Sequence, residues 1–463
     1  MIAALHGRSG KTVITLGLLR SLMRRGIVVQ PFKKGPDFID TGWHRSACGR
    51  VSRNLDSFFM TPEQIRGIMA QASAGSDLSI IEGAMGLFDG TDVEGSTSSA
   101  EIAKITGAPV VLVIDTTRMT RTTAALVLGC QHFDPEVQIA GVILNRVGGK
   151  RHEGLIRQSI ESYCGIPVIG AIPTDVSLEI PDRHLGLLSS QEAPALEQKL
   201  DEIADVIDRY LDLEAFLSIA REAKLPAKFY VPLTVPSSAS LSPSVAKPRI
   251  AVIRDPAFCF YYEENLQALE EQGAELVFVN SLESQCLPND IHALYIGSGF
   301  PEVFAAQLEA NTSFRSSVKE HIEADLPVFA EGGGLMFLGQ TLTYQGQSCE
   351  MVGALQLDTI LQDKRQAHGY SVLEVTSDQS WLKPGTVLKG HQHHHGKVVT
   401  LNADQPMVFT TRKGQGINSS QDGIAYRNTL ATCSHINALA SPLWAEAFVN
   451  QARKNRQGTE ACL

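Results

Sequence analysis

The segment GRSGKT, Gly7 to Thr12, has the residue types and the spacing of a phosphate-binding loop. It lies between the apolar run IAAL and the helical pattern VITLGLLRSL. In such a loop backbone N–H groups and the helix N-terminus cradle phosphate, while Lys11 reaches the β- and γ-phosphates and Thr12 coordinates Mg²⁺. The strict pattern GxxxxGK[ST] is not met, because Leu5 stands at its first glycine position. An ordinary helix start is the alternative interpretation, but the position after the first strand favours a phosphate loop.

Two further segments place charged side chains at the ends of apolar strands. PFKKGPDFIDTGWH follows IVVQ and gathers four charges around a Gly-Pro turn: Lys33, Lys34, Asp37 and Asp40. SIIEGAMGLFDG puts Glu82 at the end of a strand, where a carboxylate can hold Mg²⁺ or its water. Either loop alone could be a solvated turn. Three such loops at successive strand ends favour a ligand site, because open α/β sheets bind ligands at the carboxyl ends of their strands.

Length and composition limit the classes of protein to consider. The 463 residues exceed what one hydrophobic core supports, so we expect two domains of roughly 200 residues each. Apolar residues make up 43% of the chain and charged residues 19%, which is typical of a globular protein. The net charge of -10 offers no basic face for nucleic acid, although local basic residues can still hold an anionic substrate.

The cysteines and the hydropathy pattern indicate the compartment. The eight cysteines are scattered without CxxC pairs, which argues against a zinc site or a disulfide framework. No uncharged apolar stretch has the length of a membrane span, and the opening MIAALHGRSGKT is too short and too glycine-rich for a signal peptide. We therefore expect a cytoplasmic protein that binds neither membrane nor nucleic acid.

Apolar runs alternate with helical patterns along most of the chain, as in IAAL before TLGLLRSLMRR and PVVLVID before TAALVLGCQHF. This order predicts parallel βαβ units in a doubly wound α/β sheet. Residues 232–248, PLTVPSSASLSPSVAKP, are dominated by Ser, Pro and Ala, which predicts a linker. The pattern then restarts with RIAVIRD and continues through LPVFAEGGG. We expect one α/β domain over residues 1–231 and a second over residues 249–455.

Several long segments resemble one family. They are similar to segments of the cobyrinic acid a,c-diamide synthases, which amidate tetrapyrroles and are relatives of dethiobiotin synthetase. The similar segments of the first domain are GRSGKT, VQPFKKGPDFIDTGWHRSACGRVSRNLDSFFM, IIEGAMGLFDG, GAPVVLVID, GVILNRVGGKRH and PDRHLGLL. The family's class I glutamine amidotransferase domain is similar to AFCFYYEENLQALEEQGAELVF, LYIGSGFPEVFAAQL and the C-terminal third. The resemblance covers nearly the whole chain. It implies a P-loop, dethiobiotin-synthetase-like domain followed by a flavodoxin-like amidotransferase domain.

The resemblance also implies an ATP-dependent carbon–nitrogen ligase. In this family ATP phosphorylates a carboxylate, and ammonia then displaces phosphate from the acyl phosphate. The residues implied to hold ATP are Gly10, Lys11, Thr12 and, at the adenine, Asn145. Those implied to hold Mg²⁺ are Thr12, Asp37 and Glu82. Lys33 is implied to neutralise the transferred phosphoryl group, which makes the expected catalytic set of this domain Lys11, Lys33, Asp37 and Glu82.

A glycine stands where the family carries its glutaminase nucleophile. Ordinary members obtain ammonia from glutamine, which a cysteine activated by a histidine hydrolyses in the second domain. The family has AECGGLMYL where this chain has AEGGGLMFL, so the cysteine position is Gly332. His435 in CSHIN matches the activating histidine, and GSG at 297–299 matches the segment with oxyanion-hole amides. Because a thioester needs sulfur at this position, we expect free ammonia as the nitrogen donor. His435 is the candidate catalytic residue of this domain, but without a cysteine a structural role is the favoured interpretation.

A second departure from the family is GHQHHHGK, where relatives tend to have GHEFHYS. His391, His393, His394 and His395 could ligate a metal or the iron of a porphinoid, because imidazole suits iron and cobalt. Alternating residues of a strand point to opposite faces, so at most two of the four would converge. A surface strand that has drifted is the favoured alternative.

Two classes of function stay open. The first is ATP-dependent amidation of tetrapyrrole carboxylates with ammonia, with cobyrinate, sirohaem or nickel-sirohydrochlorin as substrate. The second is a non-catalytic tetrapyrrole carrier or regulator, which the lost cysteine and the lost P-loop glycine favour. The retained charged and polar set argues against a carrier, since a scaffold has no need of such costly residues. A homodimer is compatible with either function.

Overall fold

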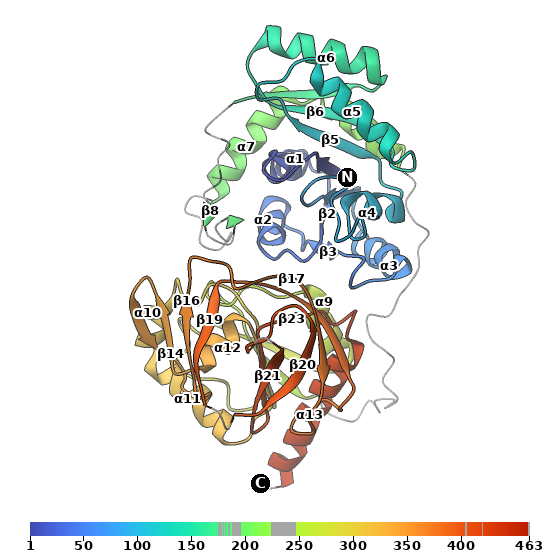
Figure 1. Ribbon diagram of the computed structural model, residues 1–463. Helices are drawn as coiled ribbons and strands as arrows, with labels where there is room; N and C mark the ends of the chain where they lie inside the picture. The colour runs from blue at the N-terminus through green and yellow to red at the C-terminus, as the bar shows by residue number, and fades with distance from the viewer. Residues whose placement is uncertain are drawn as a thin grey trace. The chain divides into compact units, whose positions relative to one another are not determined.

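The computed structural model describes residues 1–174, 178, 180, 182–183, 186–187, 196–223, 247–402, 405–418 and 420–461. The chain divides into two compact units, Met1–Val231 and Pro232–Leu463, coloured blue to green and yellow to red in Figure 1. Almost all of the predicted linker, residues 232–248, and half of PDRHLGLL, residues 181–188, lie outside the described residues. Across these described ranges, no helix is both long enough and apolar enough to cross a bilayer.

The first unit is built on a seven-stranded parallel sheet. Its strands are β1 (Ile2–Ala4), β2 (Val29–Lys34), β3 (Arg53–Leu55), β4 (Leu78–Glu82), β5 (Val110–Asp115), β6 (Ile139–Val147) and β7 (Val168–Pro173). Its helices are α1 (Lys11–Arg24), α2 (Ile39–Cys48), α3 (Pro62–Ala72), α4 (Ser99–Thr106), α5 (Thr122–Phe133), α6 (Lys150–Cys164), α7 (Leu196–Tyr210) and α8 (Leu213–Arg221). The strand order is β3-β2-β4-β1-β5-β6-β7, and a short antiparallel pair, β8 (Asp182–Arg183) and β9 (Gly186–Leu187), lies apart from it.

Side chains that alternate along β5 pack into two different cores. Val111 and Val113 join the core that contains α1 and α7, whereas Leu112 and Ile114 join the core that contains α5 and α6. Figure 1 shows α5 and α6 on one side of β5 and β6 and α1 on the other. A parallel sheet covered on both faces is the doubly wound arrangement that the alternating runs predict.

The second unit combines a ten-stranded mixed sheet with a four-stranded sheet. Its strands are β10 (Arg249–Ile253), β11 (Glu275–Val279), β12 (Ala293–Ile296), β13 (Val328–Glu331), β14 (Thr341–Tyr344), β15 (Gln347–Glu350), β16 (Leu357–Leu361), β17 (Ala367–Val375), β18 (Val387–His394), β19 (Gly396–Leu401), β20 (Met407–Lys413), β21 (Gln421–Tyr426), β22 (Thr429–Thr432) and β23 (His435–Ile436). Its helices are α9 (Glu263–Glu271), α10 (Ala305–Ala310), α11 (Thr312–Glu323), α12 (Gly333–Leu338) and α13 (Pro442–Ala461).

The larger of these sheets is parallel in one half and antiparallel in the other. Strands β11-β10-β12-β13-β22 pair in parallel, as predicted for an α/β domain. The sheet then continues through β21, β20, β17, β18 and β23 with antiparallel pairings, which the sequence analysis did not predict. The smaller sheet has the order β15-β14-β16-β19.

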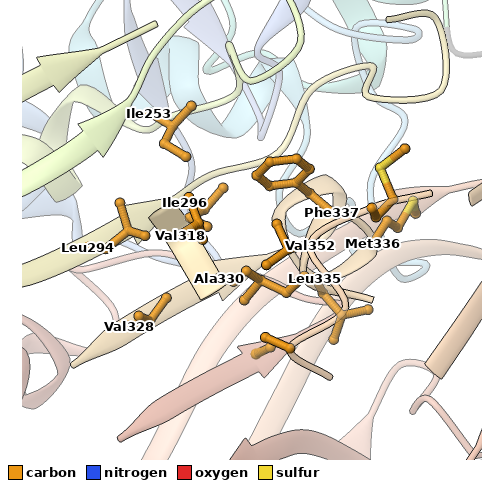
Figure 2. Packing of buried hydrophobic residues seen from close by; sticks show 14 of the residues in the cluster. Ile253, Leu294, Ile296, Val318, Val328, Ala330, Leu335, Met336, Phe337 and Val352 are labelled. Atoms are coloured by element: carbon orange, nitrogen blue, oxygen red, sulfur yellow. The ribbon is translucent and has the colours of Figure 1, made fainter. Parts of the chain in front are cut away.

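Figure 2 shows the core that holds the helix after Gly332. Leu335 and Phe337 of α12 are buried together with Ile296 of β12 and Ala330 of β13. Within LPVFAEGGGLMFL, residues 326–338, β13 and α12 are thus joined by a turn at Gly332, and the other two glycines are the first residues of α12. Packing on both sides fixes the backbone of this turn.

Candidate active site

The loop between β1 and α1 closes around Gly10. Gly10 precedes α1 with φ 98° and ψ 11°, in the left-handed region that favours glycine. A Cβ there would lie 2.2 Å from Nδ2 of Asn145, and the Asn145 amide donates a hydrogen bond of 2.9 Å to the carbonyl oxygen of Ser9. Asn145 lies on β6 and is buried. The structure thus brings together Gly10 and Asn145, two of the four predicted nucleotide residues, and Asn145 holds the loop through its hydrogen bond to Ser9.

Lys11, the first residue of α1, is only 7% exposed. Its Nζ donates to the carbonyl oxygens of His6 at 3.1 Å and Met85 at 2.7 Å. Burial, followed by the charge of Lys33, lowers the pKa of Lys11 to about 8. A buried ammonium that is bonded to neutral carbonyls gains stability when an anion arrives, so this position suits a phosphate group.

Glu82 is the centre of a buried ionic network at the carboxyl end of β4. Its Oε1 accepts hydrogen bonds of 2.7 Å from the Thr12 hydroxyl and from Nζ of Lys33. Its Oε2 lies 2.6 Å from Nε2 of His44, and Lys33 also pairs with Asp40 at 2.5 Å. The network joins β2, β4, α1 and α2, because β2 and β4 are neighbours in the sheet and the two helices begin just beyond strand ends.

The charges in this network support one another. Burial disfavours the charged form of both Lys33 and Glu82, but the partners outweigh it: Asp40 and Glu82 raise the pKa of Lys33, and Lys33 with His44 lowers the pKa of Glu82. Burial and then Asp37 raise the pKa of Asp40 to about 7, although Lys33 opposes this. Lys33 thus contacts two carboxylates, Asp40 and Glu82, and the charge of Lys11 also acts on both of them.

Asp37 and Asp40 occupy different positions in the site. Oδ1 of Asp37 accepts the N–H groups of Ile39 at 3.0 Å and Asp40 at 2.9 Å, so Asp37 caps the start of α2. Asp40, in the first turn of α2, lies 3.5 Å from the Thr12 hydroxyl. The aspartate that directly contacts Thr12 is therefore Asp40, whereas the family resemblance pointed to Asp37 as the metal ligand.

Asp40 and His44 both contact Glu82 or its partners. The sequence predicted Asp40 only as one of four charges in a ligand-binding loop, without a specific role, and did not predict His44. They are four residues apart on α2 and so share a face of that helix. His44 is fully buried, with Nδ1 3.1 Å from the Ser52 hydroxyl. The available signal was the i, i+4 Asp–His pair within GPDFIDTGWH.

The oxygen atoms of Thr12, Asp40 and Glu82 suit Mg²⁺, which prefers hard oxygen ligands. Within the described ranges, no group of three or more His, Cys, Asp and Glu residues is arranged to hold a metal ion. Protein sites for Mg²⁺ commonly supply one or two carboxylates and leave the other positions to water and substrate phosphates. The residues present therefore fit an ion that binds together with a nucleotide.

A cavity of about 120 Å³ opens beside the phosphate loop. Its lining includes Gly10, Asn145, Pro173 and Leu178, from the loop, β6 and the segment around β7. Apolar side chains such as those of Pro173 and Leu178 line part of this small hollow. Asn145, the predicted adenine residue, stands on its wall.

The second unit has the backbone of a nucleophile elbow but no nucleophile. Gly332 stands between β13 and α12 with φ 49° and ψ -103°, the sharp strand-to-helix turn on which enzymes mount an exposed nucleophile. A Cβ on Gly332 would lie 2.8 Å from Cε1 of His435 and 2.7 Å from the hydroxyl oxygen of Ser298. His435 therefore lies at the elbow, as the family resemblance implies, but faces no thiol.

Two of the three amides in the segment expected to form an oxyanion hole, and the amide of Gly333, are engaged in hydrogen bonds. In the segment 297–299, the Gly297 N–H donates to the Tyr261 hydroxyl at 2.7 Å and the Ser298 N–H to the Phe260 carbonyl at 3.4 Å. The Gly333 N–H donates to the Ser298 hydroxyl oxygen at 2.8 Å. None of these three N–H groups points freely into a pocket.

Glu331, just before the elbow, ties β13 to β23. Its carboxylate accepts the N–H of Ile436 at 2.7 Å and the Tyr295 hydroxyl at 2.9 Å. Burial raises the pKa of Glu331 to about 8. This contact positions the strand that carries His435.

The histidine run GHQHHHGK lies at the end of β18. His391 pairs with His435 across β18 and β23, with ring centroids 4.8 Å apart. Burial lowers the pKa of His435 to about 3 and that of His393 to about 4, so both imidazoles are neutral at pH 7. His394 and His395 place Nδ1 2.9 Å from main-chain carbonyl oxygens. Metal binding by this run stays a prediction.

Two protein-family models match this chain, one in each of its two units. Residues 1–188 match the CobQ/CobB/MinD/ParA nucleotide binding domain, and residues 249–443 match the CobB/CobQ-like glutamine amidotransferase domain. The fold and the two sites define the class of protein: a P-loop nucleotide-binding unit followed by a glutamine-amidotransferase-like unit.

Full-length relatives then narrow the class to one family. The cobyrinate a,c-diamide synthase of Archaeoglobus fulgidus is 42% identical over 458 residues, which cover 98% of both chains. Those of Magnetococcus marinus and Methanosarcina acetivorans are 40% and 39% identical and cover 96% and 98% of this chain and 95% of each relative. The chain belongs to the cobyrinate a,c-diamide synthase family. This confirms the predicted family and the predicted pair of α/β domains.

Proposed function

We propose that this chain is an ATP-dependent ligase that converts side-chain carboxylates of a tetrapyrrole to amides and uses free ammonia as the nitrogen donor. The names of the full-length relatives support cobyrinate, or a tetrapyrrole close to it, as the substrate. One observation carries the choice of donor: an assembled phosphate site stands in the first unit, while the elbow of the second unit carries no thiol.

The nucleotide is assigned to the loop around Gly10. The phosphates lie at the loop amides and Lys11, and the adenine lies in the cavity beside Asn145. Thr12, Asp40 and Glu82 would hold Mg²⁺, with Asp37 adding negative charge nearby. When bound, the ion would neutralise the phosphate charge and orient the phosphate groups.

The chemistry begins with a carboxylate, which is a poor electrophile toward ammonia. Transfer of the γ-phosphoryl group gives an acyl phosphate, ammonia then attacks the carbonyl carbon, and phosphate leaves. Lys11 and Lys33 neutralise charge on the phosphoryl group as it moves. Lys33 suits this role because Asp40 and Glu82 keep it charged and fixed.

Ammonia reaches this reaction from solution or from a separate glutaminase. Hydrolysis of glutamine by a class I amidotransferase requires a thiolate, and Gly332 supplies none. His435 stays as a buried neutral imidazole that packs against His391, which is a structural role.

The proposal is tested by incubating the protein with Mg-ATP, ammonium and, in separate reactions, cobyrinate, sirohaem and nickel-sirohydrochlorin. Amidation lowers the mass of the tetrapyrrole by about one dalton for each carboxylate converted, and it releases one ADP. The reaction that shows both changes identifies the substrate. Binding of a tetrapyrrole without ADP release would instead identify a carrier.

A further inference from the structure

We propose that Ser298 is a second determinant of the nitrogen donor, because its hydroxyl fills the space that a glutamine carbonyl oxygen and a nucleophile would need. Ser298 follows β12 by two residues and is 6% exposed. Its hydroxyl oxygen accepts the N–H of Gly333 at 2.8 Å. The elbow thus lacks a thiol at Gly332, and the Ser298 hydroxyl occupies the space beside it.

The N–H of Gly333 has a particular importance in an elbow. The residue after the nucleophile supplies one of the two amides that stabilise the oxyanion of the tetrahedral intermediate. That amide must point at the position of the developing negative charge. In this chain the Ser298 hydroxyl oxygen already occupies the acceptor position, so it acts as an internal substitute for the oxyanion.

Ser298 also competes with any side chain on residue 332. A Cβ at that residue would lie 2.7 Å from Oγ and 3.1 Å from Cβ of Ser298. The hydroxyl can turn away by rotation about one bond, but Cβ cannot. A cysteine at residue 332 therefore requires the Ser298 side chain to move, together with the His435 ring, whose Cε1 would lie 2.8 Å from the new Cβ. A smaller residue at 298 relieves the first of these contacts.

The neighbouring backbone offers no replacement donor at residues 297 and 298. Their N–H groups already donate to Tyr261 and Phe260. A Cβ on Gly297 would lie 2.6 Å from the ring of Tyr261, which shows how closely this ring is held against the turn. Gly333 directly follows the elbow position, so its amide is the donor whose release matters.

It follows that a thiol alone does not restore the lost activity. In the restored reaction, the introduced thiolate attacks the amide carbon of glutamine, His435 transfers the thiol proton to the departing nitrogen, and ammonia leaves. Water then cleaves the thioester and gives glutamate. The first step builds negative charge on the amide oxygen, which needs the amide that Ser298 now occupies.

The test compares Gly332→Cys with the double variants Gly332→Cys/Ser298→Gly and Gly332→Cys/Ser298→Ala, and measures glutamate release from glutamine. We expect the single variant to react with iodoacetamide but to release little glutamate. Freeing one oxyanion donor is expected to raise the rate of the double variant Gly332→Cys/Ser298→Gly by about 10²–10³-fold over that of the single variant. Ser298→Ala removes only the hydroxyl, keeps Cβ and adds no glycine flexibility to the backbone. The glutamate-release rate of the double variant Gly332→Cys/Ser298→Ala is therefore expected to lie between those of the single variant and of Gly332→Cys/Ser298→Gly.

Ser298→Gly without the cysteine is the matched control and should release no glutamate, because it has the open hole without the nucleophile. Double variants that are no faster than Gly332→Cys alone would overturn the proposal. The assay needs neither ATP nor a tetrapyrrole, so its outcome is independent of the outcome for the proposed amidation.

Discussion

Lys11 and Lys33 lie in one site, but at the residue scale they have different surroundings. Lys33 neutralises the buried carboxylates of Glu82 and Asp40, with N···O distances of 2.7 and 2.5 Å. Lys11 instead donates to main-chain carbonyl oxygens. Loss of one partner from a buried ion pair is costly because it strands the other charge. The two lysines should therefore respond differently to the same substitution.

We predict that Lys11→Ala abolishes amidation and leaves the fold intact, whereas Lys33→Ala destabilises the first unit. Removal of one group that stabilises transition-state charge costs about 10²–10³-fold in rate. Breaking the Lys33 pairs should lower the free energy of unfolding by about 3–5 kcal/mol. ADP release and denaturant unfolding of both variants measure the two effects. Normal turnover by Lys11→Ala would refute the assignment of the ATP site.

A second prediction at this scale separates Asp40 from Asp37. Asp40→Asn should raise the Mg²⁺ concentration needed for half-maximal amidation by at least about tenfold, and excess Mg²⁺ should restore part of the rate. Asp37→Ala should lower the free energy of unfolding by about 1 kcal/mol, because α2 loses its cap. Asp37→Asn is the matched control, since asparagine caps a helix equally well.

These variants are read by titrating Mg²⁺ in the amidation assay and by unfolding in denaturant. If Asp37→Asn shifts the Mg²⁺ requirement as strongly as Asp40→Asn, the family-derived assignment of Asp37 to the metal holds and our assignment of Asp40 does not.

At the scale of the elements, the sequence predicted which strand ends carry the site but not how one helix completes it. GKT, GPD and Glu82 follow apolar runs, and the carboxyl ends of parallel strands must meet at one edge. Whether Asp37 or Asp40 reaches Thr12 depends on where α2 begins. Asp37 precedes the first helical residue, Ile39, and binds N–H groups of the first turn, whereas Asp40 lies within that turn. Helix ends are set by capping contacts that a hydrophobic pattern does not contain.

The second unit shows a further limit of the sequence. The turn at Gly332 was predictable, because a strand, three glycines and a helix stand in order. The contact of Ser298 with Gly333 and the pairing of His391 with His435 join residues far apart in the chain. Antiparallel register between distant strands is set by packing of whole faces, which local periodicity does not reveal.

Glu331 gives a prediction about the link between β13 and β23. Its pKa is about 8 in the folded chain, against an ordinary value near 4.5. Between these two values the native state binds a proton that the unfolded state has released, so the stability of the second unit should fall as pH rises through this window. The expected slope is at most about 1.4 kcal/mol for each pH unit.

Glu331→Gln stays neutral and should flatten this decline. The measurement is denaturant unfolding at about pH 5 and about pH 8, monitored by tryptophan fluorescence. A Trp43→Phe background leaves only Trp381 and Trp444, so the fluorescence change comes from the second unit alone. Equal pH slopes with and without the substitution would show that Glu331 is not the group responsible.

At the scale of the whole molecule, the two units differ in what their sites can still do. The first unit presents Lys11, Thr12 and Glu82 in an assembled site. The second preserves the elbow backbone and His435, but Gly332 has no nucleophile and Ser298 covers an oxyanion-hole amide. We propose that this member of the cobyrinate a,c-diamide synthase family keeps a working ligase site and cannot generate ammonia from glutamine.

The most direct test of this account compares ammonium with glutamine as the donor, using the unmodified protein, Mg-ATP and the accepted tetrapyrrole. We expect amide formation with ammonium, at a rate that rises with pH as the fraction of NH₃ grows, because NH₃ and not NH₄⁺ is the nucleophile. With glutamine alone we expect neither amide nor glutamate. Glutamate release by the unmodified protein, or equal rates with the two donors, would contradict it.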